Sequence, residues 1–177
     1  MSSNFFGHLS TVTRHRSTVF IHCCKAGIPW RGFWHDISKF SPTEFIPSVK
    51  HYAGGRRSPN ELERADYGYS LAWMHHKGRN RHHFEYWTDY DPVTHVMSPV
   101  KMPKKYLVEM FCDRVGASKI YKGKDYTDSA PYDYFMRGHA RLKMHPETAR
   151  ELENLLTMLR DKGEKETFRY IRKEFLR

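Results

Sequence analysis

Cysteine is scarce in this sequence, and no cysteine pair has the spacing of a metal-binding or redox motif. The chain contains only Cys23, Cys24 and Cys112, and no two of them form a CxxC pair. Neither a disulfide framework nor a thiolate zinc ribbon is therefore indicated. We expect a protein of a reducing compartment, the cytoplasm.

Long apolar segments are also missing. No stretch approaches the roughly 18 apolar residues that a membrane-spanning helix needs. The first residues, MSSNFFGHLSTVTRHR, lack the continuous apolar segment of a secretory signal. With 177 residues, 39% of them hydrophobic, the chain has the size of one domain, and we expect a soluble protein without a membrane partner.

Acidic residues are too few to balance the basic ones. The chain has 30 Lys and Arg against 20 Asp and Glu, which gives a formal charge of +10. Such a surface favours anionic partners, from small phosphate-containing molecules to nucleic acid, and does not choose among them. A non-enzymatic, basic nucleic-acid-binding protein is therefore one hypothesis, and it predicts salt-dependent binding without turnover.

Apolar residues recur at three- and four-residue steps along most of the chain, which predicts helices. The first helix carries Leu9 to Ala26 and ends at Gly27, and the second begins at Pro29 and continues through Phe40. Further helices are expected over 41–52, over a segment from about 61 that runs into the histidine pairs, and over 103–121, 145–163 and 164–177. Loops are expected over 53–60, over 87–103 and after 121.

No internal repeat and no convincing strand accompany these helices. The fold class is therefore expected to be all-α, a single helical bundle. Within it we expect a metal-binding helical domain over 1–145 and a C-terminal helical pair over 146–177 that packs on it.

Polar side chains interrupt the apolar faces of these helices. In 103–121, Asp113 fills the gap in a stripe formed by Tyr106, Met110, Ala117 and Ile120. A carboxylate that faces a core must be paired, protonated or bound to a metal, because burying a lone charge is costly.

Imidazoles recur in the same way in other helices. His15 and His22 share the inward face of the first helix, His76 follows the line of Ala72, and the second helix supplies His35 and Asp36. Histidine and aspartate ligands that converge from several helices suit a transition metal such as Mn, Fe, Co or Zn, present as one or two ions. Taken singly, an inward histidine is more often a hydrogen-bonded core residue, and Asp113 could pair with Arg16 or Arg114.

These residues, read as His15, His35-Asp36, Lys39, His76 and Asp113, resemble the ordered signature of the HD-domain superfamily of metal-dependent phosphohydrolases. The resemblance covers about 11–119 and implies an all-helical fold with one or two divalent ions. More closely, the whole chain is similar to an uncharacterised family of short bacterial and phage proteins, through the segments HDISKFS and HHKGRNRHHFEYW. This closer resemblance implies no activity.

The superfamily resemblance implies roles for individual residues. The implied metal ligands are His15, His35, Asp36, His76 and Asp113. Of these, His76 would complete a second ion or orient substrate, together with His75 and His83. The short separation of His15 from His35 leaves the first ligand open, because the H-x-x-x-V context favours His15 whereas simple hairpin geometry favours His22.

Several further residues are candidates for the chemistry itself. Lys39 lies one helical turn after His35, where it could contact a metal-bound phosphate, so Lys39, His76 and Asp36 are the catalytic candidates. Substrate binding is expected at Arg79, Asn80 and His83, with Arg81 and the basic pair Arg56-Arg57 nearby. Glu44 or Glu85 could act as general acid or base, Trp73, Tyr86 and Trp87 could stack on a base, and His82 remains open between a site residue and a solvated one.

The leading hypothesis is therefore a metal-dependent phosphohydrolase acting on a nucleotide or a related phosphate ester through a metal-activated water. The same ligands would also suit an HD-type di-iron oxygenase, a minority activity in that superfamily. The expected partner in the first case is an anionic, phosphate-containing small molecule.

Overall fold

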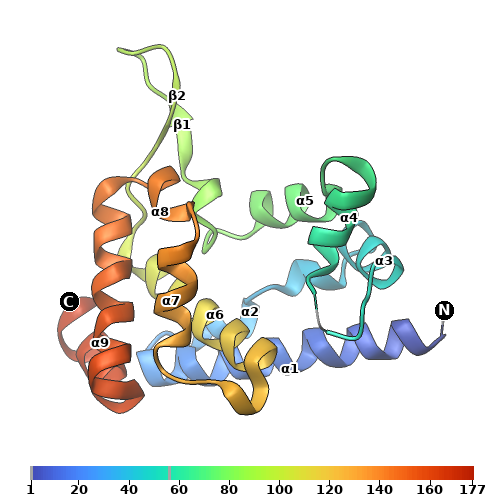
Figure 1. Ribbon diagram of the computed structural model, residues 1–177. Coiled ribbons are helices and arrows are strands. Elements are labelled where there is room, and N and C mark those ends of the chain that lie inside the picture. The colour runs from blue at the N-terminus through green and yellow to red at the C-terminus, as the bar shows by residue number, and fades with distance from the viewer. Residues whose placement is uncertain (1, 56) are drawn as a thin grey trace.

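The computed structural model describes residues 2–55 and 57–177 and is predominantly helical, which confirms the expected class (Figure 1). The longer helices are α1 (Ser2–Ala26), α3 (Pro42–Lys50), α4 (Pro59–Tyr67), α5 (Leu71–Arg79), α6 (Lys104–Lys122), α7 (Ala130–Arg137) and α9 (Pro146–Tyr170). The short elements are α2 (Pro29–Trp34), α8 (Ala140–Lys143), the single turns η1 (Ile37–Phe40), η2 (Phe84–Tyr86) and η3 (Gly123–Asp125), and the terminal π-helix η4 (Ile171–Phe175).

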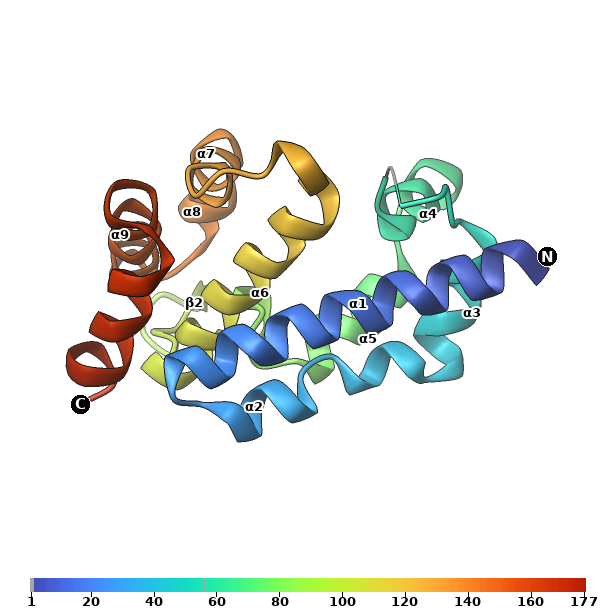
Figure 2. The ribbon, with the colours of Figure 1, turned by 90° about the horizontal axis from the view of Figure 1, so that it is seen from below.

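The chain reverses after α1, so that α2, η1 and α3 run back alongside it (Figure 2). Gly27 ends α1 in the left-handed conformation, with φ 84°, and Pro29 opens α2. Gly32 lets the two helices approach closely, because a Cβ there would lie 2.6 Å from the Cβ of Cys23. This close contact holds the residues that follow α2 against the middle of α1.

Helix α6 forms the centre of the apolar core and packs on both α1 and α9. Its fully buried side chains are Leu107, Val108, Phe111, Cys112 and Val115. They meet Val19 and Cys23 of α1 and the leucines 152, 155, 156 and 159 of α9. A Cβ at Gly116 would lie 2.8 Å from Val19, so this glycine allows the close crossing of α1 and α6.

The prediction of a single helix over 29–40 is wrong. Helix α2 ends at Trp34, and Asp36 adopts the left-handed conformation (φ 54°, ψ 25°) before η1 begins. Aspartate tolerates this conformation better than most residues. His35 and Asp36 therefore lie in a turn between two helices.

The helix expected to start near 61 and run into the histidine pairs is two helices. Gly68 adopts a φ of 79° and ends α4, and the Ser70 hydroxyl then caps α5 by accepting a hydrogen bond from the backbone N–H of Trp73, 3.0 Å away. Ala65 and Tyr69 are exposed as a result, whereas Ala72 and His76 remain buried.

Two expected loops contain regular structure. In 87–103, Thr88–Tyr90 (β1) pairs with Met97–Pro99 (β2) in an antiparallel hairpin that projects from the helical body (Figure 1). After 121, α7 and α8 fold back against α6 and α9. α7 buries only Pro131 and Phe135, and two apolar residues in so short a helix do not produce a recognisable periodic pattern.

The predicted division of the C-terminal segment at Gly163 is confirmed. Gly163 has φ 73° and ψ 173° inside α9, and the following Glu164 turns back toward α1 and α6. Its carboxylate pairs with Lys25 at 2.9 Å, with Lys119, and with His22 at 3.6 Å. In the part of the chain that the structure describes, no helix combines the length and apolar character needed to cross a bilayer.

Replacing Glu164 by Gln should destabilise the protein at neutral pH. His22, Lys119 and Lys25 hold the pKa of the Glu164 carboxyl below its usual value of 4.5, against the opposing effect of burial. A lowered pKa stabilises the fold above the unfolded value, and this contribution disappears as the pH falls through the folded value. We expect a loss of about 1 to 2 kcal/mol at pH 7 that shrinks as the pH falls below about 4.5, measured by urea unfolding.

The control is Glu166→Gln, which removes an exposed carboxylate of the same helix that pairs with Arg169. It should change the free energy of unfolding by less than about 0.5 kcal/mol. A Glu164→Gln effect that does not vary with pH would contradict the pairing described here.

Candidate metal centre

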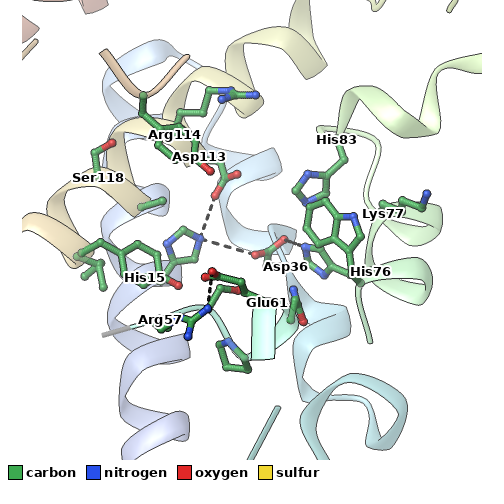
Figure 3. A pocket seen from close by; sticks show the side chains of 18 of the residues that line it. His15, Asp36, Arg57, Glu61, His76, Lys77, His83, Asp113, Arg114 and Ser118 are labelled. Atoms are coloured by element: carbon green, nitrogen blue, oxygen red, sulfur yellow. Dashed lines mark hydrogen bonds and ion pairs between the residues drawn. The ribbon is translucent and has the colours of Figure 1, made fainter. Parts of the chain in front are cut away.

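Asp36 lies at the centre of the candidate site, with only 2% of its surface exposed. Its two carboxylate oxygens face different histidines. Oδ2 lies 3.5 Å from Nε2 of His35 and 3.7 Å from Nε2 of His15, and Oδ1 lies 3.3 Å from Nε2 of both His76 and His82. The left-handed turn at Asp36 thus directs one carboxylate between two sets of imidazoles (Figure 3).

The first set joins α1, the turn after α2, and α6. It consists of His15, His35, Asp36 and Asp113, whose ligand atoms lie within 4.8 Å of one another. Asp113 Oδ1 is 3.0 Å from Nε2 of His15 and 3.6 Å from Nε2 of His35. This geometry selects His15 over His22, which lies instead beside Glu164 and stacks on Phe168.

The second set shares Asp36 and adds His76, His82 and His83, again with ligand atoms within 4.8 Å of one another. His76 comes from α5, whereas His82 and His83 come from the segment between α5 and η2. His82 is 1% exposed, so it is no solvated loop residue. The two sets share Asp36, and each could hold a metal ion.

Two buried glutamates hold the imidazole rings from behind. Glu109 Oε1 lies 3.1 Å from Nδ1 of His35 and 3.2 Å from Nδ1 of His82, and Arg31 donates to its other oxygen at 2.6 Å. Glu44 does the same for Nδ1 of His75 and His76, at 2.7 Å each. A hydrogen bond at Nδ1 fixes the ring so that a bare Nε2 points to the metal, which is the usual support of a histidine ligand.

The carboxylates stabilise positive charge at this centre. Burial alone would lower the pKa of His35, but Asp36, Asp113 and Glu109 raise it well above its ordinary value. Burial also opposes ionisation of Glu109, yet its contacts with His35 and His82 lower its pKa to about 2. Such a field favours a divalent cation.

His83 behaves differently from these rings. Burial, together with His82 and His76, holds its pKa well below the ordinary value. It is therefore a neutral imidazole at physiological pH, which is the form that binds a metal.

Unsatisfied atoms provide a test of whether the residues fit a metal. The buried atoms His35 Nε2, His82 Nε2, His83 Nε2 and Asp36 Oδ1 have no hydrogen-bond partner among the described residues, and each belongs to one or both of the two sets. Buried polar atoms are almost always paired, so unpaired atoms gathered here point to ligands that would satisfy them. Imidazole nitrogens mixed with carboxylate oxygens fit a divalent transition ion.

A cavity of about 1010 Å³ opens beside the two sets of ligands. His15, Asp36, His76, His83 and Asp113 line it, together with residues of α3, α4 and α7. Several cations also line it: Lys39, Arg57, Lys77, Arg114, Lys122, Arg137 and Lys143. The cavity therefore joins the metal ligands to a cationic wall.

Most of the stripe predicted on α6 lines this cavity, although Tyr106 does not, and both Tyr106 and Met110 belong to the apolar core. Met110, Asp113, Ala117 and Ile120 all line the cavity. The core face carries Phe111 and its neighbours instead, and a helix buried on several sides does not reveal from its periodicity which side holds a site.

The predicted substrate-binding residues are only partly brought together. His83 lines the cavity, but Arg79 is exposed and does not. Asn80 is buried behind the site, where its side-chain N–H donates to Ser38 at 2.8 Å. Arg81 donates to the Tyr106 hydroxyl on another face.

The other candidates divide in the same way. Lys39 lies in the cavity, with Nζ 3.4 Å from Asp36 Oδ2. Trp73 lines the cavity, whereas Tyr86 and Trp87 do not. Arg57 lines it as well, and Arg56 lies outside the described residues.

Glu109 is the functional residue that the sequence reasoning missed. It precedes Asp113 by one helical turn and therefore shares its face of α6, which is a signal that the sequence contains. The sequence indicates Glu44 only as a general acid or base, but its contacts with His75 and His76 show that it holds their rings in place.

The fold and the centre together define a helical protein with a buried cluster of histidines and carboxylates that could hold a metal ion. Residues 4–158 match the model of a family of unknown function (DUF5662), so the chain belongs to that family. The matched range includes every residue of the two ligand sets. No curated protein and no solved structure matches the chain.

Replacing Glu109 by Gln should weaken metal binding while the helices remain formed. The substitution removes the charge that fixes the rings of His35 and His82 but preserves the shape of the side chain. We expect the dissociation constant for Mn²⁺ or Zn²⁺ to rise about 10- to 100-fold, measured by calorimetric titration. Circular dichroism reports whether the helices are retained.

A matched control is Glu63→Gln, because Glu63 is also a buried carboxylate but bonds Ser70 and the backbone of Leu71 away from the centre. This variant should bind metal like the unmodified protein. Equal metal affinity in the Glu109→Gln variant would show that Glu109 does not support the ligands.

Proposed function

We propose that this protein is a metal-dependent phosphohydrolase that acts on a nucleotide or a related phosphate ester. The observation that carries the proposal is the position of Asp36, whose two oxygens each face a separate pair of imidazole Nε2 atoms. A carboxylate in this position can bridge two divalent ions. Sites with two metal ions bridged in this way recur in enzymes that hydrolyse phosphate esters.

A divalent ion bound here would lower the pKa of a coordinated water and neutralise charge on a phosphoryl oxygen. The ligands suit that task, since neutral imidazoles hold an ion without cancelling its charge. Asp36 and Asp113 supply hard oxygen donors on either side of His15 and His35. The resemblance of His15, His35-Asp36 and Asp113 to the HD signature supports the same chemistry.

Lys39 can stabilise the charge that develops on the phosphoryl group. Its ammonium lies beside Asp36 at the edge of the cavity. Burial would lower its pKa, but Asp36, Asp113 and Glu44 raise it above the ordinary value, so Lys39 stays protonated at physiological pH. A fixed cation next to the reacting group favours the transition state over the substrate.

Glu85 is the better candidate for the acid that protonates the leaving group. Burial raises the pKa of its carboxyl, and its buried Oε2 atom has no hydrogen-bond partner in residues 2–55 and 57–177. Glu44, by contrast, has a lowered pKa despite burial, because hydrogen bonds from His76 and His75 stabilise its charged form. A carboxyl that remains protonated closer to neutral pH is the more effective proton donor.

The cavity fits a substrate of nucleotide size. Its volume of about 1010 Å³ lies at the upper end of small-molecule sites, which span roughly 300–1000 Å³. Trp73 contributes an aromatic ring to the lining, and the cations at the wall match an anionic ligand.

Metal analysis of the purified protein followed by a phosphatase screen with Mn²⁺, Co²⁺ and Fe²⁺ tests the proposal. Turnover of one or more phosphate esters that depends on metal is the expected result. Bound iron with oxygen consumption and no ester hydrolysis would favour the di-iron oxygenase. Salt-dependent nucleic-acid binding without metal or turnover would favour the non-enzymatic alternative.

Substitutions of the two aspartates should change metal stoichiometry in different ways. Asp36→Asn removes the shared ligand and should abolish binding of both ions and all turnover. Asp113→Asn touches only one ligand set and should leave about one ion per chain, with turnover reduced at least 100-fold. Elemental analysis after dialysis gives the stoichiometry.

His95→Ala is the control, because His95 lies in the exposed hairpin, where it bonds Tyr90 far from the ligand sets. It should bind two ions and keep full turnover. Two bound ions in the Asp36→Asn variant would contradict the bridging role of Asp36.

Replacing Lys39 by Met should separate catalysis from metal binding. The charge next to the phosphoryl group is lost while every ligand remains, so we expect unchanged metal content and a kcat lowered by about 100- to 1000-fold. The control is Lys50→Met, an exposed lysine of α3 that contacts Tyr67 and does not line the cavity. Loss of metal from the Lys39→Met variant would assign this residue to the assembly of the centre and not to the reaction.

A further inference from the structure

Arg114 is a cation of the cavity wall that forms no ion pair within 4.0 Å with any acidic side chain of the described residues. It follows Asp113 in α6 and lines the cavity (Figure 3). Asp113 pairs with His15 and His35, and the buried Nε atom of Arg114 has no hydrogen-bond partner among the described residues. The guanidinium carbon lies 5.5 Å from the centroid of the Phe135 ring, which is its main contact with α7.

Other cations near the centre differ from Arg114 in this respect. Arg31 donates to Glu109 at 2.6 Å, and Lys39 lies 3.4 Å from Asp36. A guanidinium with a buried, unpaired nitrogen is costly, and a contact with an aromatic face offsets only part of that cost. The Arg114 side chain lines a cavity large enough for a ligand, so an anion bound there could pair with its guanidinium.

We propose that Arg114 binds a second anionic group of the substrate, a phosphate or a carboxylate, while the reacting phosphate lies at the metal ligands. This inference rests on the proposed function and narrows it to substrates that carry two anionic groups. The planar guanidinium matches such groups because it can donate two parallel hydrogen bonds to their oxygens.

The position of Arg114 would hold the second anionic group of the substrate apart from the reacting phosphate. Consecutive residues of a helix point in different directions, so Asp113 and Arg114 approach the cavity from different angles. Asp113 faces the imidazoles, whereas Arg114 faces α7, where Phe135 lies behind the guanidinium. The second anionic group would therefore lie beside the metal centre and toward α7, where Arg137 also lines the wall.

Binding of unreactive phosphonates to the metal-loaded protein tests the proposal without turnover. The probes are methylphosphonate, with one anionic group, and methylenediphosphonate, its longer homologue propylenediphosphonate and phosphonoacetate, with two. In the unmodified protein the best two-group probe should bind at least about 10-fold more tightly than methylphosphonate. The preference between the diphosphonates and phosphonoacetate shows whether the second group is a phosphate or a carboxylate.

The Arg114→Gln variant should lose this preference. We expect its affinity for the best two-group probe to fall about 10- to 100-fold, while its affinity for methylphosphonate changes less than about 3-fold. Arg114→Lys keeps the charge but cannot donate two parallel hydrogen bonds. Its affinity for the best two-group probe should lie between those of the unmodified protein and the Arg114→Gln variant. It is the deciding variant if Arg114→Gln does not fold. Arg150→Gln removes an exposed cation that does not line the cavity and should bind every probe like the unmodified protein.

The outcomes separate this inference from the proposed function. Equal binding of every two-group probe by the unmodified protein and the Arg114 variants overturns the inference, whether or not the protein hydrolyses phosphate esters. Binding that depends on Arg114, in a protein that hydrolyses no ester, supports the anion site and rejects the phosphohydrolase. Metal content measured before and after titration ensures that the probes bind the protein and do not remove its ions.

Discussion

The burial of Asp36 among four imidazoles is the constraint on which the rest of the structure depends. A carboxylate with 2% of its surface exposed needs polar partners, and those partners come from separate parts of the chain. α1 supplies His15, α5 supplies His76, and the segment after α5 supplies His82. The close helix contacts at Gly32 and Gly116 serve this arrangement, because they bring the turn after α2 and the middle of α6 against α1.

The centre has two chemically different sides. Behind the rings, Glu44 and Glu109 contact the Nδ1 atoms. On the other side, His15, Asp36, His76, His83 and Asp113 line the cavity. The two glutamates thus fix the rings, and the cavity gives the direction from which an anionic ligand could approach.

The sequence was sufficient for the fold class and for most of the ligands. Helical spacing identified α1, α6 and the division at Gly163, and the order of His15, His35-Asp36 and Asp113 indicated a common site that the geometry brings together. The breaks at Asp36 and at Gly68 to Ser70 were missed because they depend on single left-handed residues within otherwise helical patterns. The sequence indicates Arg114 only as a possible partner of Asp113. That Asp113 pairs with histidines instead, and that Arg114 contacts Phe135, depends on the position of α7, a short helix that the sequence pattern does not reveal.

Glu109 touches one ring from each ligand set, His35 from the first and His82 from the second, through the same oxygen atom. Any change in the charge or orientation of one ring is therefore felt directly by the other. An ion bound at one candidate position would therefore act on the other through Glu109, and the affinities of the two positions would not be independent of each other.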